Sequence, residues 1–240
     1  RLPEDLRPRL RHRRSRFDLL FHSGEIDPAE WGDRVDRNFQ FALKLPQEIT
    51  HERRLRDAGD LLIRFLDVCA ELGPKQGPIL IQLGPDFGPS ELPALATFLP
   101  LLPPTVDFAV EFRQRGWINE GVLALLKEHR VALALSDGRW VPRNVLLKLA
   151  EQPTSDFAYL RWMGPDRTIV DYSRIQVDRS RELGYWIDTL RGLTKRVKTA
   201  YGYVNNHFAG HSPATIRMLQ EGLGLPTVAP DKMGEQLGLF

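Results

Sequence analysis

The sequence offers little sulfur chemistry and no segment suited to a membrane. Cys69 is the only cysteine among 240 residues, which excludes a disulfide framework and a thiolate zinc cluster. It lies beside Leu66, Val68 and Leu72 on a predicted helix, so a position in the core is favoured. No apolar run approaches the roughly 18 residues that a spanning helix needs, and no signal-peptide pattern is visible. We therefore expect a cytoplasmic protein without membrane contact.

The sequence also has little net charge, because its positive and negative side chains nearly balance. The formal net charge is +2, so the body of the protein is not a polycation made for nucleic acid. The basic charge is uneven, however, because residues 1–16 hold seven arginines against Glu4 and Asp5. The segment 7–16 (RPRLRHRRSR) could contact nucleic-acid phosphates. A solvated helix face is the commoner origin of such a charge run, and both interpretations stay open.

The chain does contain a series of short apolar segments that end on polar or charged side chains. Gly, Pro or Asp lies near their ends, which is typical of buried strands. They alternate with helical patterns, as in an α/β fold of the TIM-like (β/α) barrel class, whose site lies where the parallel strands end. The predicted strands are 39–45, 79–83, 106–112, 131–136, 157–162 and 197–204, with 17–21 and 226–229 as weaker candidates.

Helical periodicity is visible between these segments. Residues 52–72 place Leu55, Leu62 and Phe65 on one face, and further helices are predicted over 118–130, 178–193 and 213–222. Ser212 is a plausible N-cap, with Pro213 at the first helical position. At this length we expect one barrel domain over 1–225, followed by a flexible tail over 226–240.

An ordered set of motifs resembles the YecE-like proteins, the family catalogued as domain of unknown function 72. The resemblance covers residues 38–222 and implies a TIM-like barrel, but the family has no generally assigned activity. The motifs, in chain order, are Phe41-Ala-Leu-Lys44, Ile49-Thr-His51, Gly77 to Gln82, Glu111-Phe-Arg113 with Trp117, Asp137, Tyr159-Leu-Arg161 ending in Gly164, and Asn205-Asn206 with Gly210.

The chain departs from the family pattern in three places. The family's short first strand with Gly and Trp is not found, and residues 1–16 look more like its first helix, so the first strand is expected to be missing from this chain. Gln114 stands where the family often has a histidine, and Met163 stands where it often has the histidine of Arg-x-His-Gly. A mechanism that needs those two histidines is not expected here.

Three cationic side chains follow different predicted strands and should converge at one mouth of the barrel. Lys44, Arg113 and Arg161 there favour an anionic ligand such as phosphate or carboxylate. The start of the helix at Ser212 adds N–H groups that favour the same ligand class. The alternative is that Lys44 or Arg161 closes the rim through a salt bridge to Glu111 or Asp137. The other candidate substrate-binding residues at this mouth are Gln82, Trp117, Asn205 and Asn206.

Two carboxylates are the candidate catalytic groups. Glu111 and Asp137 end neighbouring strands and could act as general acid and base, with His51 as a third candidate. The same three residues could hold a divalent metal ion, although the six histidines form no ligand-spaced pair. Simple pairing of the carboxylates with nearby arginines is an equally good interpretation.

Aromatic residues also lie near the predicted strand ends. Trp117, Trp140, Tyr159 and Trp162 could stack a base or a sugar. Packing in the core or at the rim is the commoner role of such side chains.

The last five residues carry the clearest partner signal. Gln236, Leu237, Leu239 and Phe240 resemble the pentapeptide by which bacterial polymerases and repair proteins bind the DNA sliding clamp. A glutamine would anchor by hydrogen bonds while Leu and Phe fill an apolar groove, and a flexible tail would let the peptide reach it. The alternative is a tail that packs back on the barrel.

The leading functional hypothesis is a barrel that binds or acts on a phosphate-bearing substrate, which could be nucleic acid, and that is tethered to the sliding clamp. A hydrolase or nuclease-like enzyme would fit this description. Two alternatives stay open. One is an enzyme for a sugar phosphate or a similar anionic metabolite, with the tail incidental. The other is a non-catalytic binding module that recruits other proteins to the clamp.

Overall fold

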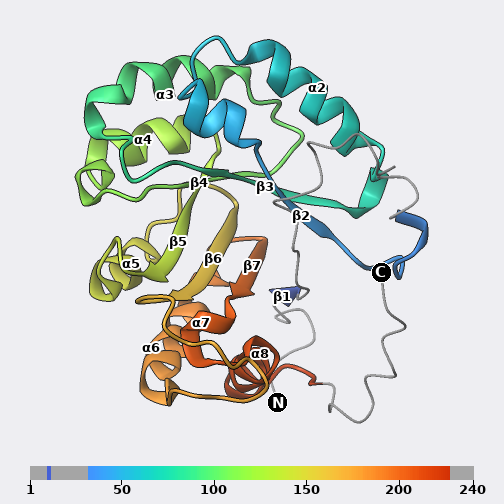
Figure 1. The fold of residues 1–240 in the computed structure, drawn as a ribbon, viewed down its shortest axis with the longest axis vertical. Helices are drawn as coiled ribbons and strands as arrows, with labels where there is room; N and C mark the ends of the chain where they lie inside the picture. Colours follow the sequence, from blue (N-terminus) through green and yellow to red (C-terminus); the bar gives the residue numbers. More distant parts are fainter. Residues whose placement is uncertain (1–9, 12–31, 228–240) are drawn as a thin grey trace.

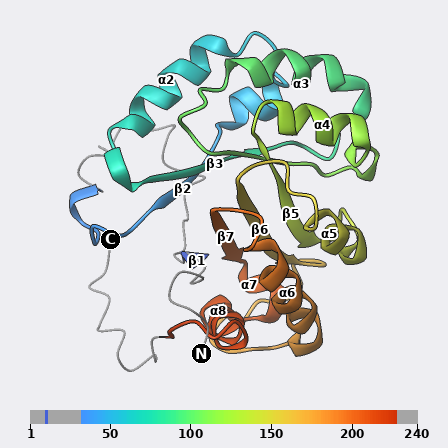
Figure 2. The same ribbon diagram turned by 180° about the vertical axis from the view of Figure 1, so that it is seen from behind.

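The computed structural model describes residues 10–11 and 32–227 of the chain. Its strands form one parallel sheet in the order β1-β7-β6-β5-β4-β3-β2, and Figures 1 and 2 show this sheet curled, with helices along its outer side. Every neighbouring pair in this order is parallel. The strands are β1 (Leu10–Arg11), β2 (Phe41–Lys44), β3 (Gln76–Gln82), β4 (Phe108–Glu111), β5 (Ala132–Gly138), β6 (Phe157–Gly164) and β7 (Thr199–Val204).

The predicted α/β class and all six main strands are confirmed. Strands β2 to β7 follow one another in sequence and in space, which is the connectivity of a (β/α) barrel, and β1 and β2 stand at the two ends of the order. The described strands therefore make an open, barrel-like curve. The candidate strands over 17–21 and 226–229 fall on residues outside the described ranges, except for 226–227, which are not in a strand.

The prediction of a helix within residues 1–16 is wrong for the two of these residues that are described. Leu10 and Arg11 pair with Ala200 and Tyr201 as a short parallel strand. The edge of β7 offers unpaired backbone N–H and C=O groups, and a segment that lies beside them satisfies them by pairing. The rest of the arginine run lies outside the described residues.

The helices lie between the strands, as α2 (Gly59–Ala70), α3 (Leu92–Phe98), α4 (Glu120–Glu128), α5 (Arg143–Leu149), α6 (Ser180–Leu193), α7 (Asn206–Ala209) and α8 (Ser212–Gly222). The helix predicted from residue 52 begins only at Gly59. The π-helical turn Glu48–Glu52 comes first, and Arg54, Leu55 and Asp57 then have left-handed backbone angles, which interrupt a helix. Sequence patterning missed α3, α5 and α7, which have seven residues or fewer and are too short to show a clear period. No helix in these described ranges is long and apolar enough to cross a membrane.

Side chains of the sheet alternate between two buried surfaces. Leu43, Ile81 and Val110 point outward into the main core, where the helices cover the sheet. The neighbouring positions Leu80 and Ala109 point inward, where they join a second cluster with Ala132, Ala134, Phe157, Tyr159 and Tyr201. Apart from Leu80, this inner cluster consists of alanines and aromatic residues, and the next inward-facing positions toward the strand ends define the candidate site.

Cys69 occupies the core position that its helical face predicts. It is buried in α2 and belongs to the main core. Burial raises the pKa of its thiol to about 12, because the thiolate would lose its hydration. The thiol is therefore a packing group at neutral pH rather than a nucleophile.

Candidate functional site

Glu111 is the centre of a polar network at the carboxyl edge of the sheet. Its side chain is 4% exposed, and its two oxygens accept hydrogen bonds from side chains on three other strands. Gln82 Nε2 on β3 donates to Oε1 at 2.7 Å. Ser136 Oγ on β5 and Arg161 Nη1 on β6 donate to Oε2 at 2.6 and 2.5 Å. Arg113 Nε, just beyond β4, lies 3.4 Å from Oε1.

Strand register explains why these side chains meet. Gln82 is the register partner of Glu111, and Ser136 is the partner of Arg161. Each lies two positions beyond a residue of the inner cluster, so each points to the same inner surface. Lys44 on β2 joins at the edge, where its Nζ lies 3.5 Å from Gln82 Oε1. The predicted convergence of Lys44, Gln82, Glu111, Arg113 and Arg161 is therefore present.

Glu111 is ionised because its donors outweigh its burial. Burial alone would raise the pKa of this carboxyl, since a charged group loses hydration in the interior. The positive charge of Arg161 and the hydrogen bonds from Ser136, Arg161 and Gln82 act the other way, and the net pKa lies below its usual value. Arg161 thus forms the rim salt bridge that the sequence left open as an alternative to ligand binding. Its side chain is still 19% exposed, and that of Arg113 is 23% exposed.

His51 borders the same network from the turn that follows β2. Its Nδ1 lies 2.8 Å from the hydroxyl of Thr50, which is buried. The pKa of His51 is lowered by burial first, and then by the positive charges of Lys44 and Arg113. The imidazole is therefore neutral at pH 7, where it can accept or release a proton.

Two rim loops are held together beside His51. Arg54, in the loop before α2, bonds both Asp86 and Glu91 in the loop after β3, and Arg56 Nη1 adds a bond to Glu91 Oε2 at 2.7 Å. Three residues of the loop before α2 have left-handed backbone angles, with φ of 51° at Arg54, 65° at Leu55 and 47° at Asp57. Such angles are unfavourable for residues other than glycine, so the ion pairs help to hold this loop in its shape.

Asp137 does not join Glu111, and this corrects the expected pairing of the two carboxylates. Its Oδ2 accepts hydrogen bonds from Trp186 Nε1 on α6 at 2.7 Å and from Arg143 Nε on α5 at 2.6 Å. Asp137 follows Ser136 directly, so it points to the opposite, helix-covered face of the sheet. It ties β5 to two helices and is not placed to act with Glu111.

Three other side chains that were expected to bind a ligand instead contact neighbouring parts of the chain. Trp117 is fully buried between Phe87 and Phe112, and its Nε1 donates to the Phe87 carbonyl at 2.8 Å. Asn205 caps α7 by accepting from the backbone N–H of His207. Asn206 Oδ1 accepts from both the backbone N–H and the hydroxyl of Ser212 at 2.9 and 2.7 Å.

The predicted N-cap at Ser212 is shifted by one residue. Ser212 is the first residue of α8, and His211 occupies the capping position. Asn206 Oδ1 accepts from the first backbone N–H of this helix, so that N–H is not available to the anion that was expected there.

The aromatic candidates divide between the core and the rim. Tyr159 is buried in the inner cluster, and Trp162 is buried on the outer face, where it packs edge-to-face on Trp186. Trp140 is half-buried, and the guanidinium groups of Arg113 and Arg139 lie 5.9 and 4.3 Å from its ring centre. Of these aromatics, Trp140 is the one beside the site.

Sequence reasoning missed Ser136, Thr50 and Tyr203 as members of the site. Ser136 and Thr50 contact Glu111 and His51 directly. Tyr203 packs on Tyr159 at 4.9 Å between ring centres, and burial raises its pKa well above the usual value. Serine, threonine and tyrosine are common throughout the chain. Only the alternation of side chains along β5 and β7 could have identified Ser136 and Tyr203 as inward-facing residues.

The described residues contain no group of three or more His, Cys, Asp or Glu side chains placed to hold a metal ion. His51 and Glu111 lie near the mouth, but Asp137 is on the other face of the sheet. The set of three oxygen and nitrogen ligands that the sequence suggested is therefore not assembled by these residues.

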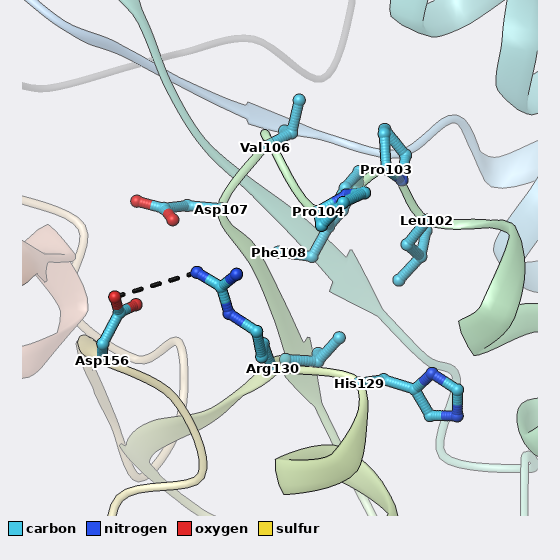
Figure 3. A pocket seen from close by; sticks show the side chains of 10 residues that line it. Leu102, Pro103, Pro104, Val106, Asp107, Phe108, His129, Arg130 and Asp156 are labelled. Atoms are coloured by element: carbon cyan, nitrogen blue, oxygen red, sulfur yellow. Dashed lines mark ion pairs between the residues drawn. The ribbon is translucent and has the colours of Figure 1, made fainter.

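A small pocket lies at the opposite edge of the sheet, where the strands begin (Figure 3). Asp107, His129, Arg130 and Asp156 line it, and Arg130 Nη2 lies 3.8 Å from Asp156 Oδ2. Burial and the nearby charge of Asp156 raise the pKa of Asp107. The stability face of a (β/α) barrel is this amino-terminal edge, and functional groups gather at the other one. We therefore place the candidate site at the Glu111 network.

Comparison with known families now bears on this arrangement. The family model described as "Protein of unknown function DUF72" matches residues 26–236. The chain belongs to the DUF72 family. It is 37% identical to the UPF0759 protein YecE of Escherichia coli (strain K12) over 232 residues, a match that covers 88% of this chain and 82% of that protein. The resemblance stated from the motifs is confirmed.

Solved structures of the DUF72 family share the fold. A family member from Thermotoga maritima is 21% identical with a TM-score of 0.64, over 83% of this chain and 79% of the other. One from Enterococcus faecalis is 20% identical with a TM-score of 0.67, over 83% of this chain and 84% of the other. At these identities the likeness concerns the fold alone.

Proposed function

We propose that this DUF72 chain binds an anionic group, best a phosphate, at the carboxyl edge of its sheet. The observation that carries the proposal is the gathering of three cationic side chains at one edge of the sheet. Among the described residues, Lys44, Arg113 and Arg161 lie at the edge where Glu111 sits. His51 beside them is neutral at pH 7.

The exposure of the arginines supports an anionic ligand. Arg113 and Arg161 both contact Glu111, and a guanidinium presents its N–H donors in one plane. The partial exposure of both side chains leaves part of this donor surface at the mouth. Planar donor edges of this kind suit the oxygens of phosphate or carboxylate.

The ligand would be a phosphate-bearing molecule, either a small metabolite such as a sugar phosphate or a nucleic acid. Trp140, stacked by Arg113 and Arg139, could contact a ring next to the phosphate. His51 supplies a group able to transfer a proton, which is compatible with an enzyme as well as with a binding module.

Calorimetric titration with inorganic phosphate tests the proposal. Lys44→Met should weaken phosphate binding about tenfold or more, because a charged hydrogen bond contributes about 1.5–3 kcal/mol. Lys127→Met is the matched control, since this exposed lysine in the last turn of α4 carries the same charge far from the mouth. Absence of binding by the wild type, or equal affinities in Lys44→Met and the wild type, would contradict the proposal.

We also propose, on the sequence of the last five residues, that the tail binds the bacterial DNA sliding clamp. Gln236 would anchor the peptide, and Leu239 and Phe240 would fill an apolar groove. These residues lie outside the described ranges, so the proposal is supported by the motif alone. It stands apart from phosphate binding and is tested separately.

A further inference from the structure

We infer that His51 offers the lone pair of its Nε2 atom to the bound anion, so that the site selects an oxyanion carrying a proton over one carrying none. Hydrogen phosphate and a singly protonated phosphomonoester belong to the first class, and sulfate belongs to the second. The inference rests on the proposed anion site and names the ligand class that this site takes.

The contacts of Thr50 point to one tautomer of the imidazole. Thr50 Oγ1 lies 2.8 Å from His51 Nδ1 and 3.2 Å from the carbonyl oxygen of Pro46, four residues earlier. The hydroxyl has one proton, and the carbonyl can only accept. If the hydroxyl donates to Pro46, it accepts from Nδ1–H. The lone pair of the neutral ring then resides on Nε2.

Nε2 is the ring atom left for a ligand. Nδ1 is taken by Thr50, and Nε2 makes no hydrogen bond with the described residues. The ring lies close enough to Lys44 and Arg113, which we propose hold the anion, to feel both of their charges. An anion bound by these cations would therefore lie near a hydrogen-bond acceptor, which is unusual in a site of positive charge.

The charges around His51 keep this acceptor neutral. Burial, Lys44, Arg113 and Arg54 all lower its pKa, and Asp86 alone raises it. These groups come from β2, from the end of β4 and from the two rim loops. Asp86 is itself bonded by Arg54, so its influence on the imidazole is partly offset. At pH 7 the site thus combines strong donors with one acceptor.

A hydrogen-bond acceptor that faces the anion distinguishes protonated from unprotonated oxyanions. A phosphate oxygen that carries hydrogen can donate to Nε2, whereas sulfate brings only lone pairs and leaves two acceptors facing each other. A polar group that loses its hydrogen-bond partner weakens the complex, so we expect a preference of about tenfold or more for phosphate. Below the pKa of His51 the ring becomes a donor, and sulfate should then gain affinity.

The experiment compares phosphate and sulfate by calorimetry at pH 7.5 and over a series of lower pH values in four proteins. The wild type should prefer phosphate about tenfold or more at pH 7.5, and its sulfate affinity should rise as the pH falls through the pKa of His51. His51→Phe should lose both effects. Thr50→Val, which keeps His51 but removes the group that selects the tautomer, should reduce the preference. His129→Phe is the control, because His129 lies at the opposite edge of the sheet.

Nitrogen NMR of His51 gives a second readout that does not depend on a variant. The free protein at pH 7.5 should show a proton on Nδ1 and none on Nε2. An Nε2–H tautomer, or a preference for phosphate that persists in His51→Phe, overturns the inference while anion binding stands. Failure of the wild type to bind either anion overturns the inference and the proposed function together.

Discussion

Replacing Glu111 by Gln should lower the stability of the protein and at the same time strengthen anion binding. The carboxylate accepts from Gln82, Ser136 and Arg161 at 2.5–2.7 Å and is 4% exposed. An amide keeps the shape but has one acceptor oxygen, so it cannot receive all three donors. It also removes the charge that the arginines compensate.

The size of the loss follows from these contacts. Removing one partner of a buried ion pair costs about 3–5 kcal/mol. Arg161 is 19% exposed and can recover some hydration, so we expect the lower end of this range, about 3 kcal/mol. For a chain of this size that corresponds to a melting temperature about 6–12 °C lower. The affinity for phosphate should move the opposite way, since a negative charge has left the site.

The effect should depend on pH in a defined direction. The pKa of Glu111 is lowered on folding, so its contribution is present above the unfolded value of about 4.3 and is lost as pH falls through the folded value. The difference in melting temperature between wild type and Glu111→Gln should thus be full at pH 7 and shrink below about pH 4.

Asp137→Asn is the matched control for this substitution. Asp137 is also buried and accepts two hydrogen bonds, but it lies on the outer face of the sheet. We expect it to destabilise the protein and leave the phosphate affinity unchanged. Thermal unfolding followed by circular dichroism and titration calorimetry measure the two properties. A folded Glu111→Gln protein that no longer binds phosphate, or one that melts like the wild type, would refute the reasoning.

Two further predictions concern the backbone and the tail. Gly210→Ala should destabilise the protein by about 2 kcal/mol or more, because Gly210 has φ of +106° and a Cβ there would lie 2.6 Å from the Arg174 carbonyl oxygen. Gly184→Ala in α6, where the added Cβ would meet nothing within 4 Å, should stabilise the protein by about 0.5–1 kcal/mol. Urea unfolding measures both variants, and a Gly210→Ala protein more stable than Gly184→Ala would contradict the prediction. Changing Leu239 and Phe240 together to Ala should abolish calorimetric binding to the clamp, which we expect at roughly micromolar affinity, without moving the melting temperature. A large fall in that temperature would instead make the tail structural.

The parallel sheet and much of the site could be predicted because two simple patterns agreed. Short apolar segments alternated with helical ones, and the strands ended on polar residues. Since carboxyl ends of parallel strands share one edge, Lys44, Gln82, Glu111 and Arg161 were expected at that edge once the strands were correct. The short helices α3, α5 and α7 escaped prediction, because seven residues or fewer do not establish a helical period.

The sequence by itself determined the order of the strands, the edge at which the charges gather and the family of the protein. It could not determine the face of the sheet to which each polar end points. Parallel strands are buried on both sides, so both alternating sets are apolar and neither marks the inside. Ser136 and Asp137 are neighbours in sequence, yet one bonds Glu111 and the other bonds Trp186. Only the packing of α5 and α6 against the outer face decided which of the two residues belongs to the site.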